Sequence, residues 1–218
     1  MKVARTERPA GTKSVYSLAL IALLFALCVS AQAQQPKKVP RVGFLTLLTK
    51  PDPREEAFVQ GLRELGYIDG QNITIEYRRA AGTVEHLPAL AKELVRLKVD
   101  LIVARSTPAI EAAKNVTKTI PIVMLGAADP VRSGFVASLA RPGGNITGNS
   151  NINPELAGKR LELLREIVPN LSRVAFLAYG GDPAHKLFMK EARDAGEKLK
   201  IQIRTYVIAK TTELEPTL

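Results

Sequence analysis

Short apolar runs alternate with amphipathic stretches over most of the chain. Residues 42–48 form an almost continuous apolar run, which is typical of a strand buried on both faces of a sheet. Shorter apolar or alternating runs predict three more strands, at residues 73–77, 100–104 and 121–125. Helical spacing of apolar positions, with Pro at helix starts and Gly at a helix end, predicts helices between them. These helices are expected at residues 53–65, 87–97, 108–116 and 131–139.

The order of these elements predicts the fold class. Successive strand–helix units imply a parallel sheet with right-handed crossovers and helices on both faces. A closed barrel of eight such units needs roughly 250 residues, and this chain has 218. We therefore predict an α/β fold with an open, doubly wound parallel sheet.

A segment rich in Pro and Gly, residues 141–148, separates this first set of elements from a second, shorter set. The second set predicts helices at 154–168 and 184–199 and strands at 174–178 and 201–207. We expect an N-terminal α/β lobe over residues 34–148 and a C-terminal lobe over residues 149–218, with the crossover near 147–151. So few elements leave a sheet edge and a sheet face uncovered, so we expect the second lobe to be incomplete.

The N-terminal residues show the three parts of a secretory signal. Basic residues, among them Arg5 and Lys13, precede an apolar run at residues 15–29, and an Ala-Gln-Ala sequence ends at Ala33. The apolar run is shorter than the roughly 20 residues that a membrane span needs. We predict a cleavable signal peptide over residues 1–33 and a periplasmic mature protein.

Cys28 allows a second interpretation, a lipid anchor. Leu27 occupies the position where a lipobox carries a small residue, and Phe25 stands where Leu is usual. We therefore favour a Cys28 that is discarded with the signal peptide. The mature chain then contains no cysteine, which is compatible with an oxidising compartment.

Charge and composition narrow the function classes. Removing residues 1–33 takes away four Lys/Arg and one Glu, which lowers the net charge from +10 to +7. The remaining Lys and Arg are interspersed with acids, as on a solvated surface, so we expect no nucleic-acid partner. One Cys and two His, His86 and His185, offer no metal-ligand cluster, so we expect no metal and no cofactor.

No sequence motif of a common catalytic site is present. Phosphate-loop, dinucleotide-binding and nucleophile-elbow patterns are all absent from the sequence. His185 lies near Asp182, but no nucleophile accompanies them in the sequence. We therefore expect a protein that is not an enzyme.

Ligands of open α/β sheets bind outside the carboxyl ends of the strands. This rule selects the loops after the first, third and fourth strands and the segment at the crossover. The candidate ligand-binding residues there are Thr46, Leu47, Thr49, Ser106, Thr107, Ala127, Asp129, Asn149 and Asn151.

Thr107 stands before the predicted helix 108–116. It can cap that helix, whose free N–H groups and partial positive charge suit a ligand carboxylate, or it can cap a helix in a loop that binds nothing. Arg105 either adds charge to this anion site or lies on the surface.

Asp129 also has two interpretations. It can accept a hydrogen bond from a ligand amine, or it can be only the N-cap of helix 131–139, with Pro130 at the first position. We favour the cap, although a capping residue can also border a cleft. Tyr179, which ends a strand of the second lobe, can offer its ring from the opposite wall.

Several short stretches, taken in their order and spacing, resemble one known family. They are Gly61-Leu62-Arg63-Glu64-Leu65-Gly66-Tyr67 with Gly70-Gln71-Asn72, Leu87-Pro88-Ala89-Leu90-Ala91, Thr107-Pro108-Ala109, Ile120-Pro121-Ile122-Val123, Asp129-Pro130-Val131 with Gly134, and Ser138-Leu139-Ala140-Arg141-Pro142-Gly143-Gly144-Asn145-Ile146-Thr147-Gly148. Over residues 39–207 the chain resembles the substrate-binding proteins of ABC importers, in the family that includes tryptophan/phenylalanine-type binding proteins. The second lobe matches less closely, and residues 179–182 depart from the Asn-Pro-type loop common in the family.

The resemblance implies a type I periplasmic-binding-protein fold, in which two doubly wound lobes close over a small molecule, with delivery to an ABC permease in the inner membrane. We therefore expect the periplasmic solute-binding component of an ABC importer, a monomer that captures a small polar or amino-acid-like molecule. Two alternatives remain: a ligand-sensing domain of a receptor or regulator, or a non-binding, truncated remnant of such a protein.

Overall fold

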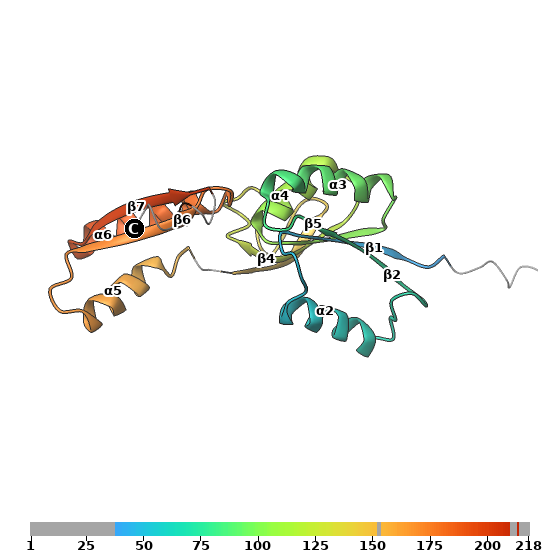
Figure 1. Cartoon of the computed structure of the whole chain (residues 1–218), viewed down its shortest axis with the longest axis horizontal. Helices are drawn as coiled ribbons and strands as arrows, with labels where there is room; N and C mark the ends of the chain where they lie inside the picture. Colours follow the sequence, from blue (N-terminus) through green and yellow to red (C-terminus); the bar gives the residue numbers. More distant parts are fainter. Residues whose placement is uncertain (1–37, 152–153, 210–212, 214–218) are drawn as a thin grey trace, which may run out of the picture. The chain divides into compact units, whose positions relative to one another are not determined.

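The computed structural model describes residues 38–151, 154–209 and 213. The strands of this part form two separate sheets (Figure 1). The predicted signal peptide, including Cys28, lies outside the described residues. In the part of the chain that the structure describes, no helix combines the length and the apolar character needed to cross a bilayer.

The first sheet has five strands in the order β2-β1-β3-β4-β5, and every neighbouring pair is parallel. The strands are β1 (Arg41–Thr46), β2 (Thr74–Arg79), β3 (Leu101–Arg105), β4 (Ile122–Ala128) and β5 (Ile146–Asn151). This order confirms the predicted open, doubly wound sheet. The fifth strand was not predicted, and it carries the sheet past residue 148, where we placed the lobe boundary.

Helices cover both faces of this sheet (Figure 1). They are α2 (Pro53–Glu64), α3 (Leu87–Arg96), which follows a short 3₁₀ turn at Val84–His86, and α4 (Thr107–Val116). Helices α3 and α4 pack on one face around a core that includes Leu94, Ile102 and Ile110. Helix α2 packs on the other face, where Phe58 contacts the core beside Phe44.

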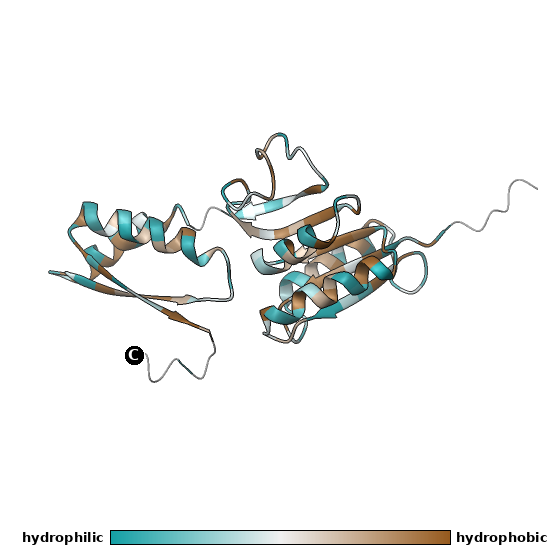
Figure 2. Ribbon diagram, turned by 90° about the horizontal axis from the view of Figure 1, so that it is seen from above, coloured by the Kyte–Doolittle hydropathy of each residue, from teal (hydrophilic) through white to brown (hydrophobic). Residues whose placement is uncertain are grey.

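The hydropathy pattern agrees with this layering. Strands β1, β3 and β4 consist mostly of apolar residues. Both hydrophilic and hydrophobic residues occur along each helix (Figure 2). Gly43 in β1 permits close packing of α3, because a Cβ atom at Gly43 would lie 2.9 Å from the Leu94 side chain. The buried faces therefore match the apolar runs from which the sheet was predicted.

The predicted helix at residues 131–139 is wrong, because the structure has a single turn there. The Phe135 N–H donates to the Pro130 carbonyl (2.8 Å), and the Gly134 N–H donates to the Val131 carbonyl (2.9 Å). This pair of bonds is the Schellman pattern that ends helices, and Gly134 adopts the left-handed conformation it requires, with φ 68°. Gly134 therefore stops the helix after its first turn.

The second sheet has two parallel strands, β6 (Arg173–Tyr179) and β7 (Gln202–Ile208). Helix α6 (His185–Leu199) packs against both strands and against α5 (Ala157–Ile167). These elements agree with the predicted ones to within a few residues at their ends.

Candidate functional site

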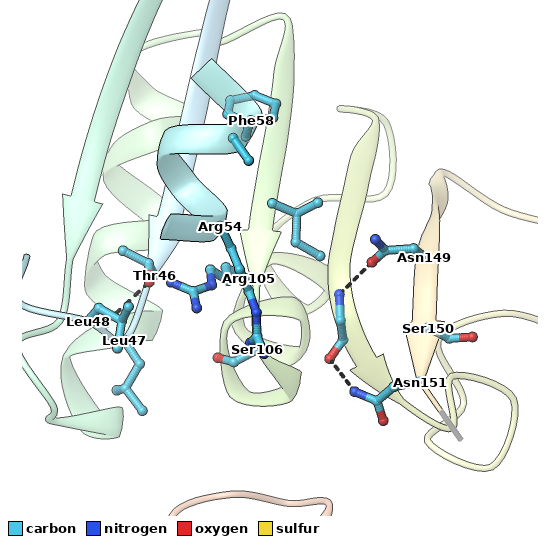
Figure 3. A pocket seen from close by; sticks show the side chains of 13 residues that line it. Thr46, Leu47, Leu48, Arg54, Phe58, Arg105, Ser106, Asn149, Ser150 and Asn151 are labelled. Carbon is cyan, nitrogen blue, oxygen red and sulfur yellow. Dashed lines mark hydrogen bonds between the residues drawn. The ribbon is translucent and has the colours of Figure 1, made fainter. Parts of the chain in front are cut away.

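The first sheet reverses its strand order between β1 and β3, because the chain continues from β1 to β2 on one side and later adds β3 on the other. In open α/β sheets, ligands bind at the carboxyl ends of the strands at such a switch point. A cavity of about 800 Å³ lies at this place (Figure 3). It is lined by Thr46, Leu47, Leu48, Arg54, Ala57, Phe58, Arg105, Ser106, Leu125, Gly126, Asn149, Ser150 and Asn151.

The strand ends and the start of α2 bring these side chains together. Leu47 and Leu48 follow β1, and Phe58 projects from the second turn of α2, so one part of the lining is apolar. Arg105 ends β3, and Arg54 lies in the first turn of α2. The cavity thus combines an apolar wall with two guanidinium groups, a combination typical of small-molecule sites.

Ser106 has the most unusual conformation in this cavity. It precedes α4 and adopts φ 81° and ψ 155°, a region that residues with a side chain rarely occupy. Its Oγ atom is buried and has no hydrogen-bond partner among the described residues. Strain together with an unsatisfied hydroxyl is characteristic of functional sites rather than of structural turns.

Arg105 is held by Asp52, the N-cap residue just before α2. The Arg105 Nη2 atom donates to Asp52 Oδ2 over 2.5 Å, and the other oxygen, Oδ1, accepts the Glu55 N–H (3.1 Å) as an N-cap. The Arg105 Nη1 atom is buried and has no partner among the described residues. One side of the guanidinium is therefore fixed, and the other makes no hydrogen bond to a described residue.

Two opposing effects act on the Asp52 carboxyl. Burial alone would raise its pKa, but the hydrogen bonds from the Glu55 N–H and from Arg105 outweigh burial and lower the pKa. Asp52 is therefore charged at neutral pH and holds Arg105 as an ion pair.

A bulge in β4 shapes the far side of the cavity. The register between β4 and β5 shifts after Met124, and one extra residue lies on β4 before Ala127. Two asparagines of β5 meet the backbone groups of Gly126 there: the Gly126 N–H donates to Asn149 Oδ1 (2.7 Å), and Asn151 Nδ2 donates to the Gly126 carbonyl (3.4 Å). Both asparagines line the cavity and stabilise its wall.

The structure brings only some of the predicted ligand-binding residues to this cavity. Those that line it are Thr46, Leu47, Ser106, Asn149 and Asn151. Those outside its lining are Thr49, Thr107, Ala127, Asp129 and Tyr179. The ligand-binding role of each residue stays a prediction.

Thr107 does not cap α4, contrary to the prediction. Helix α4 begins at Thr107 itself, and the N-cap position belongs to Ser106, whose side chain makes no capping bond. The Thr107 hydroxyl instead accepts the Ala128 N–H (3.4 Å), and the side chain is buried. Its hydroxyl therefore joins α4 to β4 within the core.

Asp129 acts as a local cap, as favoured from the sequence. Its Oδ1 atom accepts the Arg132 N–H (3.0 Å), and its Oδ2 atom lies 3.5 Å from the Arg132 guanidinium. The capped element is the single turn described above rather than a helix.

Tyr179 and its neighbours belong to the second sheet. Tyr179 ends β6, and its ring packs against Gly181, where an added Cβ atom would lie 2.8 Å from it. Asp182 accepts the Ala184 N–H (2.9 Å), while the His185 ring nitrogen Nδ1 lies 2.6 Å from the Asp182 carbonyl. Burial raises the pKa of Asp182. The two contacts of Asp182 lie at the start of α6.

Several residues at the cavity were not among the candidates. Arg54 and Phe58 line it, and Asp52 holds Arg105. Pro53 was a usable signal, because a helix that opens just after the first strand places its first turn at the carboxyl edge of the sheet. Among the residues that the structure describes, no group of three or more His, Cys, Asp or Glu is placed to hold a metal ion.

The doubly wound sheet and the cavity at its switch point are features of an α/β ligand-binding domain. Residues 51–218 match the family described as ABC transporter substrate binding protein, and the chain belongs to this family. It is similar to the tyrosine-binding protein of Clostridioides difficile (strain R20291), with 32% identity over 184 residues. That match covers 84% of this chain and 53% of the relative.

Two solved structures extend the comparison. A conserved domain protein from Vibrio cholerae O1 biovar eltor matches with a TM-score of 0.76 and 27% identity, over 83% of this chain and 61% of that one. An ABC domain in complex with L-Trp from Streptococcus pneumoniae matches with a TM-score of 0.71 and 28% identity, over 82% and 60%. These matches confirm the predicted type I periplasmic-binding-protein fold. The chain spans about half to three fifths of the length of these relatives.

Proposed function

We propose that this chain is the solute-binding component of an ABC importer and that it captures a small, amino-acid-like molecule at the cavity between β1 and β3. Family membership supports the transport role, and members of this family are normally extracellular or periplasmic. One relative is described as a tyrosine-binding protein, and another was solved in complex with L-Trp. Binding without chemistry, export to the periplasm, action as a monomer and delivery to an inner-membrane permease belong to the same proposal.

The observation that carries the proposal is the pair of unsatisfied polar atoms at the switch point. Ser106 Oγ and Arg105 Nη1 are buried without a partner among the described residues, and both residues line the cavity. A ligand carboxylate placed there accepts from both atoms and lies near the N-terminus of α4, whose partial positive charge favours an anion. The ligand then satisfies groups whose burial otherwise costs free energy.

Two substitutions of Ser106 test this placement. Ser106→Ala removes the hydroxyl and keeps the strained backbone, whereas Ser106→Gly removes the hydroxyl and relieves the strain. Loss of a hydrogen bond to a charged ligand costs about 1.5–3 kcal/mol, so both variants should bind roughly 10–100-fold more weakly. Both variants remove a buried hydroxyl without a partner, and the Gly variant, which also relieves the backbone strain, should be the more stable of the two.

The measurement is isothermal titration calorimetry of the protein with a panel of amino acids and related carboxylates, beside urea unfolding of each variant. Thr119→Ala is the control, since Thr119 is an exposed hydroxyl residue of the same lobe that does not line the cavity. Unchanged affinity in both Ser106 variants, or no binding by any member of the panel, would refute the proposal.

A further inference from the structure

At the cavity, positively charged side chains outnumber negatively charged ones. Of the residues that line it, Arg54 and Arg105 carry positive charge, and the lining contains no carboxylate. The nearby Asp52 carboxylate is bound to Arg105. Two guanidinium groups and one carboxylate leave the site with a net charge of about +1.

The excess charge belongs to Arg54. Arg54 is exposed in the first turn of α2, and its side chain forms no ion pair with any residue that the structure describes. Figure 3 shows Arg54, Arg105 and Ser106 projecting into the same part of the cavity. A carboxylate bound to Ser106 and Arg105 is therefore also within the electrostatic influence of Arg54.

An ammonium group has no anionic partner in this lining. Asp129, the residue predicted from the sequence to receive a ligand amine, lies outside the lining and is bound to Arg132. The Asn149 side-chain oxygen already accepts the Gly126 N–H. An α-amino group held beside a bound carboxylate therefore meets a net positive charge, and the Asp52 carboxylate is already paired with Arg105.

The rest of the lining suits an apolar ligand body. Leu47, Leu48, Phe58 and Leu125 line the cavity beside the arginines. Small-molecule sites commonly combine such apolar walls with a few polar groups that fix the orientation of the ligand.

We propose that this cavity selects an organic monoanion, a carboxylate with an apolar aromatic or aliphatic body and no ammonium group, over the zwitterionic amino acid of the same shape. This inference rests on the proposed function, because it assumes that a small solute binds at this cavity. It narrows the substrate class from amino-acid-like molecules to carboxylic acids.

Three matched ligand series test the inference by calorimetric titration of the protein. Each series holds the side chain constant. The first series is 3-phenylpropanoate, L-phenylalanine and phenethylamine, and the second is 3-(4-hydroxyphenyl)propanoate, L-tyrosine and tyramine. The third is 3-(indol-3-yl)propanoate, L-tryptophan and tryptamine. In at least one series the acid should bind about tenfold more tightly than the amino acid, and the amine should bind weakest.

Arg54→Gln provides the second test. The substitution should lower the affinity for the acid several-fold and bring the affinities for the acid and the amino acid closer together. Arg63→Gln, an exposed arginine in the last turn of the same helix, is the matched control and should change neither affinity.

The possible results separate the two proposals. If an amino acid binds as tightly as its acid or more tightly, the monoanion inference is overturned and the solute-binding function stands. A preference for the acid that is equally large in Arg54→Gln also overturns the inference. If no ligand of any series binds, both the inference and the proposed function fail.

Discussion

Of the substitutions that remove one partner of an ion pair between described residues, Arg79→Met should lower the free energy of unfolding most. Glu55, on the inward side of α2, is only 3% exposed, and the Arg79 guanidinium meets both of its carboxylate oxygens. The Nη1 bond measures 2.9 Å, and these hydrogen bonds raise the pKa of Arg79. The pair fastens α2 to β2 and so holds the first turn of α2 at the cavity.

The magnitude follows from the burial of Glu55. Removing Arg79 leaves a carboxylate without a partner in the core, and breaking a buried pair in this way costs about 3–5 kcal/mol. A domain of this size is stable by only about 5–15 kcal/mol. Replacing both partners, in Glu55→Met/Arg79→Met, removes the buried charge and should restore most of the lost stability.

Urea unfolding followed by far-ultraviolet circular dichroism measures these differences, since the chain has no Trp for fluorescence. Lys159→Met is the control: Lys159 pairs with Glu162 on the exposed surface of α5 (3.0 Å), where ion pairs contribute little to stability. The reasoning is refuted if Arg79→Met lies within about 1 kcal/mol of the parent, or if the double variant is less stable than Arg79→Met.

Three further outcomes are expected in the same unfolding assay. Gly148→Ala should cost at least about 2 kcal/mol, because φ is 134° there and an added Cβ would lie 2.3 Å from the Met124 carbonyl oxygen; a parent-like value would contradict this. Thr107→Val should cost about 1–3 kcal/mol by leaving the buried Ala128 N–H without its acceptor, and an unchanged stability would show that this bond contributes nothing. Burial raises the pKa of Asp182, so its charged form opposes folding. Asp182→Asn should therefore be more stable than the parent at pH 7 and lose that advantage as the pH falls through the raised pKa toward the ordinary value of 3.8; a pH-independent difference would be the contrary result.

The sequence was most informative where burial is complete. The runs behind β1, β3 and β4 are apolar because those strands are covered on both faces, and their positions were predicted to within a few residues. Strand β5 was missed because it is an edge strand with four consecutive exposed residues, so its sequence carries no apolar pattern. The helix expected at 131–139 failed at Gly134, whose role as a helix end depends on two backbone bonds that apolar spacing does not reveal.

For the candidate site, the sequence predicted mainly residues that follow the carboxyl ends of strands. The rule about strand ends found Ser106, which follows β3, and Asn149 was selected from the predicted crossover, which the structure shows to be part of β5. It missed Arg54 and Phe58, because they reach the cavity from a helix that folds over the end of β1. Their placement depends on tertiary packing, such as the buried ion pair between Glu55 and Arg79, and not on their position relative to a strand.

The choice of serine at position 106 is informative because glycine is used elsewhere in the same region. Gly126 and Gly148 adopt positive φ angles of 77° and 134° in the neighbouring strands. Ser106 adopts φ 81°, which costs a residue with a side chain about 1–3 kcal/mol and costs glycine almost nothing. Glycine would present the same backbone N–H groups at the start of α4 but no hydroxyl. The strained serine therefore supports the proposal that a ligand carboxylate accepts a hydrogen bond from the Ser106 Oγ atom, which has no partner among the described residues.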